Sequence, residues 1–265
     1  MPTRDNPPIG APCWVDLMTS DADAARAFYG GLFGWESEEP NPEFGGYFTF
    51  TRDGVRVAGG MPKQPEHGEM PDVWSTYLTV ENAEKTVEVA TSNGAQVIAP
   101  AMAVADLGSM AVIADPTGAV IGMWQPGVHT GFGVITEAGA PSWFELHTRD
   151  YDTAVAFYRD TFGWETRTMG DTPEFRYTVQ KDAASDDQYA GIMDAANFLP
   201  EGVPAHWDVY FGSADADATL AKVVELGGKV VTPAEDTPYG RLATAADPTG
   251  AMFRIVAPND QMPAR

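Results

Sequence analysis

Cysteine, basic residues and long apolar runs are scarce in this sequence, and each scarcity excludes a class of protein. The single cysteine, Cys13, cannot form an internal disulfide or a thiolate metal cluster, which predicts a reducing compartment. Sixteen Lys and Arg stand against 38 Asp and Glu, which gives a net charge of −22. Such a chain repels phosphate backbones and anionic membranes, so we expect neither nucleic acid nor a membrane as a partner.

No uncharged apolar stretch approaches the roughly 20 residues that a membrane-spanning helix needs. The first residues carry Arg4 and Asp5 among prolines, with no apolar run behind them. We therefore expect a soluble, cytoplasmic protein. A P-loop, a dinucleotide fingerprint, a nucleophile elbow and a zinc-binding helix motif are also missing, which removes the function classes that depend on them.

An internal repeat is the main feature that is present. The 29 residues from Ala11 and the 29 residues from Ala140 match at about half of their positions without a gap. Later segments correspond as well, since residues 73–100 pair with residues 206–233. The sequence therefore predicts two tandem domains, over residues 11–128 and 140–258, joined by a linker over residues 129–139.

Strand and helix signals alternate in the same order within each copy. In the first copy a strand over residues 14–18 precedes a helix that Asp21 caps and Gly34 ends. A second such unit opens with a strand over residues 73–80 and a helix over residues 82–92. Further short strands are predicted over residues 47–51, 55–60, 110–114 and 119–124 and around Val97.

The segment Asp-Pro-Thr-Gly closes both copies, at residues 115–118 and 247–250. Asp first, Pro second and Gly fourth suit a type I turn, so we interpret Asp115 and Asp247 as turn residues and not as ligands. Three of the four histidines lie in loops or at the start of a strand and are expected to be solvated or structural: His67, His129 and His206.

Three features of each copy resemble the vicinal oxygen chelate superfamily, to which glyoxalases, bleomycin-resistance proteins and extradiol dioxygenases belong. They are the paired strand and helix units, the helix ending Phe-Tyr-x-x-x-Phe-Gly-Trp (residues 28–35 and 157–164) and the Asp-Pro-Thr-Gly turn. The chain looks most like the two-domain, glyoxalase-like branch in actinobacteria. The resemblance implies an α+β fold in which two βαβββ units of each copy curve into a cupped mixed sheet around a small-molecule pocket.

Enzymes of this superfamily hold a divalent metal with His, Glu or Gln side chains from four strands. The resemblance places these positions at Trp14, Gly60, Ser75 and Gly122 in the first copy, and at Trp143, Ile192, Asp208 and Arg254 in the second. An indole and a glycine offer no lone pair, and an arginine brings a fixed positive charge. We therefore expect degenerate metal sites and no cofactor.

A displaced site in the second copy is an alternative. By alternation, Glu145 and His147 share one face of a strand, and Asp208 and Tyr210 share a face of a neighbouring strand. Glu145, His147 and Asp208 could hold one divalent metal ion, or act as acid and base without one. In the opposing interpretation, Arg254 pairs with Glu145 or Asp208, and His147 is a hydrogen-bonded pocket residue.

Aromatic and polar side chains face the two expected cups. The predicted ligand-binding residues are Trp14, Asp16, Ser75, Tyr77 and Trp124 in the first copy, and Trp143, Tyr210 and Arg254 in the second. Such side chains suit a flat or cationic organic ligand through stacking, cation–π contact and charge pairing. Trp14 and Trp143 are equally compatible with a core role, as residues that fill emptied metal sites.

The sequence thus predicts a protein that binds a small organic molecule, aromatic or cationic, such as an antibiotic. Two rivals stay open. One is a lyase, oxygenase, isomerase or hydrolase that uses Glu145, His147 and Asp208, and the other is a structural or signalling protein without a small ligand. Two copies in one chain favour a monomer, and a homodimer is also compatible.

Overall fold

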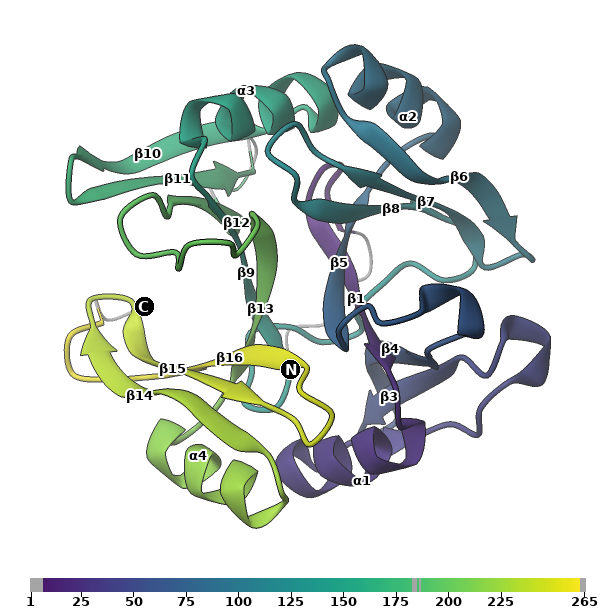
Figure 1. Ribbon diagram of the computed structural model, residues 1–265, viewed down its shortest axis with the longest axis vertical. Coiled ribbons are helices and arrows are strands. Elements are labelled where there is room, and N and C mark those ends of the chain that lie inside the picture. The colour runs from purple at the N-terminus through teal and green to yellow at the C-terminus, as the bar shows by residue number, and fades with distance from the viewer. Residues whose placement is uncertain (1–6, 183–184, 186, 263–265) are drawn as a thin grey trace.

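The computed structural model describes residues 7–182, 185 and 187–262. In this part of the chain each copy forms one eight-stranded mixed sheet (Figure 1). The first sheet contains β1 (Pro12–Thr19), β2 (Glu36–Ser37), β3 (Phe48–Arg52), β4 (Val55–Pro62), β5 (Val73–Thr79), β6 (Gln96–Val104), β7 (Gly108–Ala114) and β8 (Val120–Pro126). The second contains β9 (Pro141–Thr148), β10 (Glu165–Thr172), β11 (Phe175–Lys181), β12 (Gln188–Asp194), β13 (His206–Gly212), β14 (Lys229–Thr237), β15 (Gly240–Ala246) and β16 (Met252–Ala257).

Each copy has one helix in each of its two βαβββ units, as the sequence predicts. The helices are α1 (Ala22–Phe33), α2 (Ala83–Ser92), α3 (Tyr151–Phe162) and α4 (Ala216–Glu225), with short 3-10 turns η1 (Pro42–Phe44) and η2 (Pro65–His67) in loops of the first copy. The predicted caps are confirmed. The Asp21 side chain accepts a hydrogen bond from Ala24 N at 2.9 Å, and Gly34 ends α1 with a positive φ of 71°. None of the described helices combines the length and apolarity needed to span a bilayer.

The strand order is the same in both sheets, which confirms the duplicated α+β fold. It runs β2-β3-β4-β1-β5-β8-β7-β6 in the first copy and β10-β11-β12-β9-β13-β16-β15-β14 in the second. β1 and β9 therefore lie at the centre, each antiparallel to the first strand of the next unit. Because side chains alternate along a strand, every second residue of these central strands faces the concave side of its sheet.

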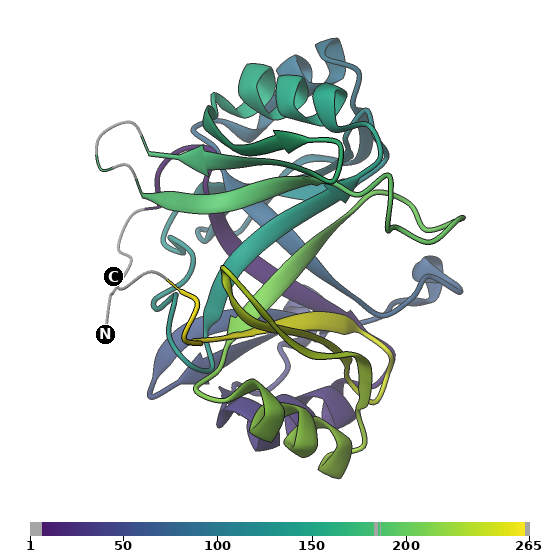
Figure 2. The same cartoon turned by 90° about the vertical axis from the view of Figure 1, so that its left-hand side faces the viewer.

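The two sheets pack back to back, so their concave faces point in opposite directions (Figure 1). Figure 2 shows the helices gathered at the two ends of the molecule, where α1 lies beside α4 and α2 beside α3. The side chains of Trp35 and Trp164, which follow α1 and α3, are buried. Their indole nitrogens donate across the copies, to Gly139 O and Gly10 O respectively.

A pair of buried tyrosines connects the copies symmetrically. Tyr29 Oη donates to Asp247 Oδ2 at 3.2 Å, and Tyr158 Oη donates to Asp115 Oδ2 at 2.9 Å. Asp115 also accepts hydrogen bonds from within its own turn, as expected for a turn residue. Both Asp-Pro-Thr-Gly turns therefore have a role that the sequence did not indicate, since each one holds the helix of the other copy.

Candidate functional site

The concave face of the second sheet collects the titratable residues that the sequence singled out. β9 places Glu145 and His147 on this face, and β13 places Asp208 and Tyr210. The strand register sets Glu145 opposite Asp208 and His147 opposite His206, and β16 brings Arg254 beside Tyr210. We call these six residues the second-cup cluster: Glu145, His147, His206, Asp208, Tyr210 and Arg254.

Glu145 is a buried carboxylate surrounded by donors. His147 Nε2 lies 2.7 Å from Oε1, Tyr210 Oη donates to Oε1 at 2.8 Å, and Tyr177 Oη donates to Oε2 at 2.7 Å. Burial by itself disfavours the charged carboxylate, but the hydrogen bonds from His147, Tyr177 and Tyr210 outweigh it and hold the pKa of Glu145 below its usual range. Glu145 is therefore ionised at neutral pH.

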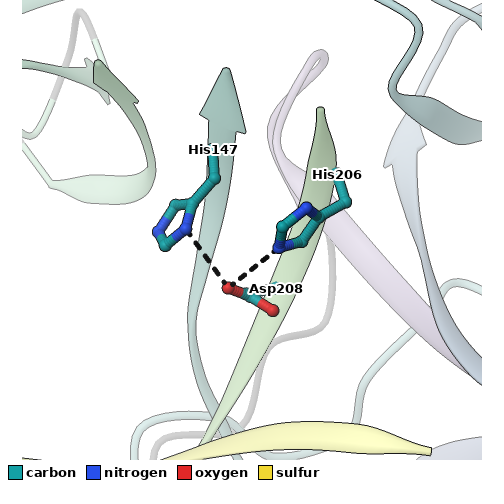
Figure 3. Close-up of side chains that lie close together, drawn as sticks. All are labelled: His147, His206 and Asp208. Atoms are coloured by element: carbon teal, nitrogen blue, oxygen red, sulfur yellow. Dashed lines mark ion pairs between the residues drawn. The ribbon is translucent and has the colours of Figure 1, made fainter. Parts of the chain in front are cut away.

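Asp208 is the second buried carboxylate, and three basic side chains converge on its Oδ2 atom. Arg254 Nε donates to it at 2.6 Å, and the imidazoles of His147 and His206 approach it at 3.6 Å and 3.7 Å (Figure 3). Burial opposes ionisation, yet these neighbours keep the pKa of Asp208 well below its usual range. The Asp208 contact in turn raises the pKa of His206.

The imidazole of His147 lies between the two carboxylates. Its Nε2 faces Glu145, and its Nδ1 faces Asp208 and lies 3.4 Å from Arg254 Nη2. Among the described residues, the group whose ligand atoms lie within 4.8 Å of one another is His147, His206 and Asp208. Glu145, which the sequence placed in this set, meets the opposite nitrogen of the ring and is not part of it.

In the second copy, side chains at the positions that the resemblance assigned to metal ligands bind protein groups. Trp143 Nε1 donates to Tyr177 Oη at 2.9 Å, and the Arg254 guanidinium binds Asp208. Gly60 and Ile192, to which the sequence assigned the remaining position, do not face the cups, and the residues that face them are Gly59 and Gly191. A Cβ on Gly191 would lie 1.9 Å from Tyr177 Oη, so Gly191 faces the cup, whereas Ile192 points into the core.

The first cup repeats part of this arrangement around Asp16. Trp14 Nε1 and Tyr47 Oη donate to Asp16 Oδ1 at 2.8 Å and 2.7 Å. Tyr47 corresponds to Tyr177, and Gly59, which lies opposite Asp16, corresponds to Gly191. In both copies, therefore, a tyrosine hydroxyl donates to a carboxylate and accepts a hydrogen bond from a tryptophan indole. A glycine lies opposite the carboxylate residue on the neighbouring strand.

The linker covers one end of the first cup. His129 packs edge-on against Trp14 with ring centroids 4.5 Å apart, and Trp124 Nε1 donates to His129 O at 2.8 Å. Trp14 and Trp124 are buried as a result, whereas Trp143 is half-buried. Burial, together with the neighbouring Arg56, lowers the pKa of His129 to about 4, so this histidine is neutral at pH 7.

Four polar residues of the two cups were missed by sequence reasoning. His206 carried a usable signal, because it alternates with Asp208 and Tyr210 on the cup face of β13. Tyr47, His129 and Tyr177 had no comparable signal. Tyr177 reaches its carboxylate from β11, two places away from β9 in the sheet, and Tyr47 reaches Asp16 from the residue just before β3. His129 reaches Trp14 from the linker.

Surface depressions elsewhere contain no comparable cluster. One of about 130 Å³ lies between the copies, where Thr79, Glu81 and Phe162 line it. Another of about 280 Å³ lies at the start of α2, beside Glu84 and Gln125. Neither depression is lined by a residue of the two cups.

The position of Asp16 in the first cup can be tested through the pH dependence of protein stability. Desolvation, only partly offset by hydrogen bonds from Tyr47, Trp14 and Tyr77, raises the pKa of Asp16 from 3.8 to about 6. The folded state therefore holds this proton more tightly than the unfolded state, and Asp16 makes stability fall as the pH rises from about 4 to about 6.

Replacing Asp16 with asparagine is expected to raise the free energy of unfolding at pH 7 by about 2–3 kcal/mol, because the amide needs no ionisation. Urea titrations between pH 4 and pH 7 measure this, with the exposed Asp23→Asn as the control. If both variants keep the wild-type dependence on pH, Asp16 does not titrate in this range.

The fold consists of two back-to-back sheets, and each sheet is cupped and built from a pair of βαβββ units. The chain belongs to the superfamily that this fold defines. Residues 13–123 and 140–255 match the Glyoxalase/Bleomycin resistance protein/Dioxygenase superfamily. Among individual relatives, the chain is 40% identical to the Mycobacterium tuberculosis protein named "Putative glyoxylase CFP32", over 98% of this chain and 100% of that protein. It is 38% identical to the anthracycline biosynthesis protein DauV of Streptomyces sp. strain C5, over 96% of each chain.

Solved structures of low sequence identity share the fold. The Mn(II)-bound glyoxalase from Novosphingobium aromaticivorans aligns with a TM-score of 0.64 at 15% identity, over 94% of this chain and 82% of that chain. The 2,3-dioxygenase LapB from Pseudomonas sp. KL28 aligns with a TM-score of 0.64 at 12% identity, over 97% and 96% of the two chains. The fold expected from the sequence is thus confirmed.

Proposed function

We propose that the cup of the second copy binds a planar aromatic small molecule without the divalent metal of the superfamily. The observation that carries this proposal is a series of aromatic rings that leads from solvent to the second-cup cluster. The rings of Tyr239 and Phe175 lie 6.3 Å apart, those of Phe175 and Tyr177 lie 5.8 Å apart, and Tyr177 binds Glu145. Tyr239 is 47% exposed, so the series is open to a ligand at its outer end.

A second aromatic surface stands beside the same cluster. Phe198, in the loop between β12 and β13, contacts the His147 ring edge-on at 5.5 Å and is 55% exposed. Aromatic side chains usually bury their rings, so exposed rings around a concave face favour a flat apolar ligand. The name of DauV supports the same class, because anthracyclines are planar polycyclic antibiotics.

The electrostatics favour an aromatic ligand over a cationic one in this cup. Asp208 is paired with the Arg254 guanidinium, and Glu145 accepts hydrogen bonds from Tyr177 and Tyr210 and contacts His147, so protein groups already stabilise both carboxylates. Arg254 lies 5.5 Å from the Tyr210 ring centroid, and its side chain is 25% exposed. Its guanidinium is therefore the group that we assign to a carbonyl or phenolic oxygen of the ligand.

The donor set does not fit a divalent metal. In the group formed by His147, His206 and Asp208, both imidazoles approach one atom, Asp208 Oδ2. Arg254 Nε already binds that oxygen at 2.6 Å. A metal ion would have to displace the guanidinium and would face its positive charge at close range. His147 is also a poor candidate for an acid or base, since both of its ring nitrogens face protein groups and its side chain is 3% exposed.

A titration tests this proposal. Anthraquinone and an anthracycline are expected to quench tryptophan fluorescence, through Trp143 and its neighbours. Phe198→Ala and Tyr239→Ala are each expected to weaken binding about 3- to 10-fold, since an aromatic contact contributes about 0.5–1.5 kcal/mol. Phe44→Ala, an exposed aromatic residue of the first copy, is the matched control and leaves the affinity unchanged. Wild-type affinity in both cup variants, or no binding of either probe, would overturn the proposal.

A further inference from the structure

The cups differ most in their charge. At the positions of His147, His206, Asp208 and Arg254, the first copy has Met18, Val73, Ser75 and Gly122. The first cup therefore lacks every basic group of the second-cup cluster and keeps one carboxylate, Asp16. Among the described residues, the groups that interact with this carboxylate are the neutral side chains of Trp14, Tyr47 and Tyr77.

The fold holds the Asp16 carboxylate in a defined position. Its Oδ1 atom accepts two hydrogen bonds, from Trp14 Nε1 at 2.8 Å and Tyr47 Oη at 2.7 Å. Gly59 makes this possible, because a Cβ at residue 59 would lie 1.9 Å from Tyr47 Oη and 2.1 Å from Asp16 Oδ1. A related arrangement recurs at Glu145, which accepts a hydrogen bond from Tyr177 Oη and also contacts His147 Nε2. Asp16 is therefore a half-buried carboxylate held in place by hydrogen bonds, and the described part of the chain places no basic side chain against it.

We propose that the first cup is a binding site for a protonated amine, with Asp16 as the charge partner of the ammonium group. The carboxylate supplies the opposite charge, and the Tyr47 and Tyr77 rings beside it supply aromatic surface, which together are the features that bind ammonium groups. The net charge of −22 attracts cations to the molecule from a distance. This site is independent of the aromatic site proposed for the second cup.

The neighbouring titratable groups do not neutralise Asp16. Tyr47 and Tyr77 have pKa values raised by burial and stay neutral. His129, which packs behind Trp14, has its pKa lowered to about 4, and Arg56 binds its Nδ1 at 3.0 Å. Since burial raises the pKa of Asp16 to about 6, an ammonium ligand that selects the ionised carboxylate binds more weakly as the pH falls below that value.

Calorimetric titration with benzylamine, which stays protonated from pH 5 to pH 7, tests this site. The wild-type chain is expected to bind benzylamine at pH 7 and not its neutral analogue benzyl alcohol. Its affinity falls as the pH decreases from 7 to 5, by about 10-fold per pH unit once the pH is below the pKa of Asp16. Asp16→Asn is expected to weaken binding at least about 10-fold, because the amide keeps the oxygen that accepts from Trp14 and Tyr47 but has no charge.

The control is Glu43→Gln, which removes an exposed acidic charge from the loop before β3 and leaves the affinity unchanged. Thermal melts check that Asp16→Asn is folded, and the pH dependence of the wild-type chain is a test that needs no variant. Amine binding that is independent of pH between 5 and 7, or equal in wild type and Asp16→Asn, would show that Asp16 is not the charge partner. Unchanged amine binding in Phe198→Ala and Tyr239→Ala separates this site from the one in the second cup.

Discussion

Replacing Arg254 with methionine is expected to lower the free energy of unfolding at pH 7 by about 3 kcal/mol, because it leaves Asp208 buried and charged without its cation. Asp208 is 8% exposed, and Arg254 Nε is its shortest contact among the described groups, at 2.6 Å. Methionine keeps an apolar stem of similar length, and it removes the guanidinium, whose central carbon lies 5.5 Å from the Tyr210 ring centroid. Urea denaturation at pH 7 measures it.

A double variant and a control complete the urea denaturation test of Arg254→Met. Arg254→Met combined with Asp208→Asn is expected to regain most of the lost stability, since no buried charge then lacks a partner. Arg241→Met is the matched control from the next strand, because its partners Asp217 and Asp236 are 64% and 47% exposed. Such exposed pairs contribute about 0–1 kcal/mol. Equal losses from Arg254→Met and Arg241→Met would mean that Asp208 does not depend on Arg254.

The second large effect is expected at the contact between the copies. Tyr29→Phe and Tyr158→Phe keep the buried rings and remove the hydroxyl groups that bind Asp247 and Asp115. Each hydroxyl also accepts a hydrogen bond at 2.9 Å, from Trp74 Nε1 or Trp207 Nε1, so each substitution leaves buried polar atoms unpaired. A loss of about 1–3 kcal/mol for each variant follows.

The double variant Tyr29→Phe/Tyr158→Phe shows whether the copies unfold together. The two sites share no hydrogen-bonding partner, so the losses are expected to add in one cooperative transition, in thermal or urea denaturation. The exposed Tyr239→Phe is the control and leaves stability unchanged. Two separate transitions in the wild type, or losses no larger than in this control, would contradict a stabilising role for the contact.

Local patterns explain why much of the second cup was predictable. Glu145 and His147 lie two residues apart on β9, so alternation alone sets them on one face, and the register places Asp208 opposite Glu145. The sequence offered both Glu145 and Asp208 as partners of Arg254, and the structure pairs Arg254 with Asp208. In contrast, a shift of one residue along a strand moves a side chain to the opposite face of the sheet. For this reason Gly60 and Ile192 were placed in the cups, where the structure has Gly59 and Gly191.

The duplication, the element order, the caps of the helices and the resemblance to the superfamily could all be predicted from the chain of residues alone. All of these depend on local spacing and on the similarity of residues 11–39 to residues 140–168. The folded molecule was needed to show that the Asp-Pro-Thr-Gly turns hold helices of the opposite copy, and that Tyr47 and Tyr177 bind the carboxylates. It was also needed to show that His129 covers Trp14. The physical reason is that these contacts join residues far apart in the chain, and their partners are selected by how the sheets curve and pack, which no local pattern contains.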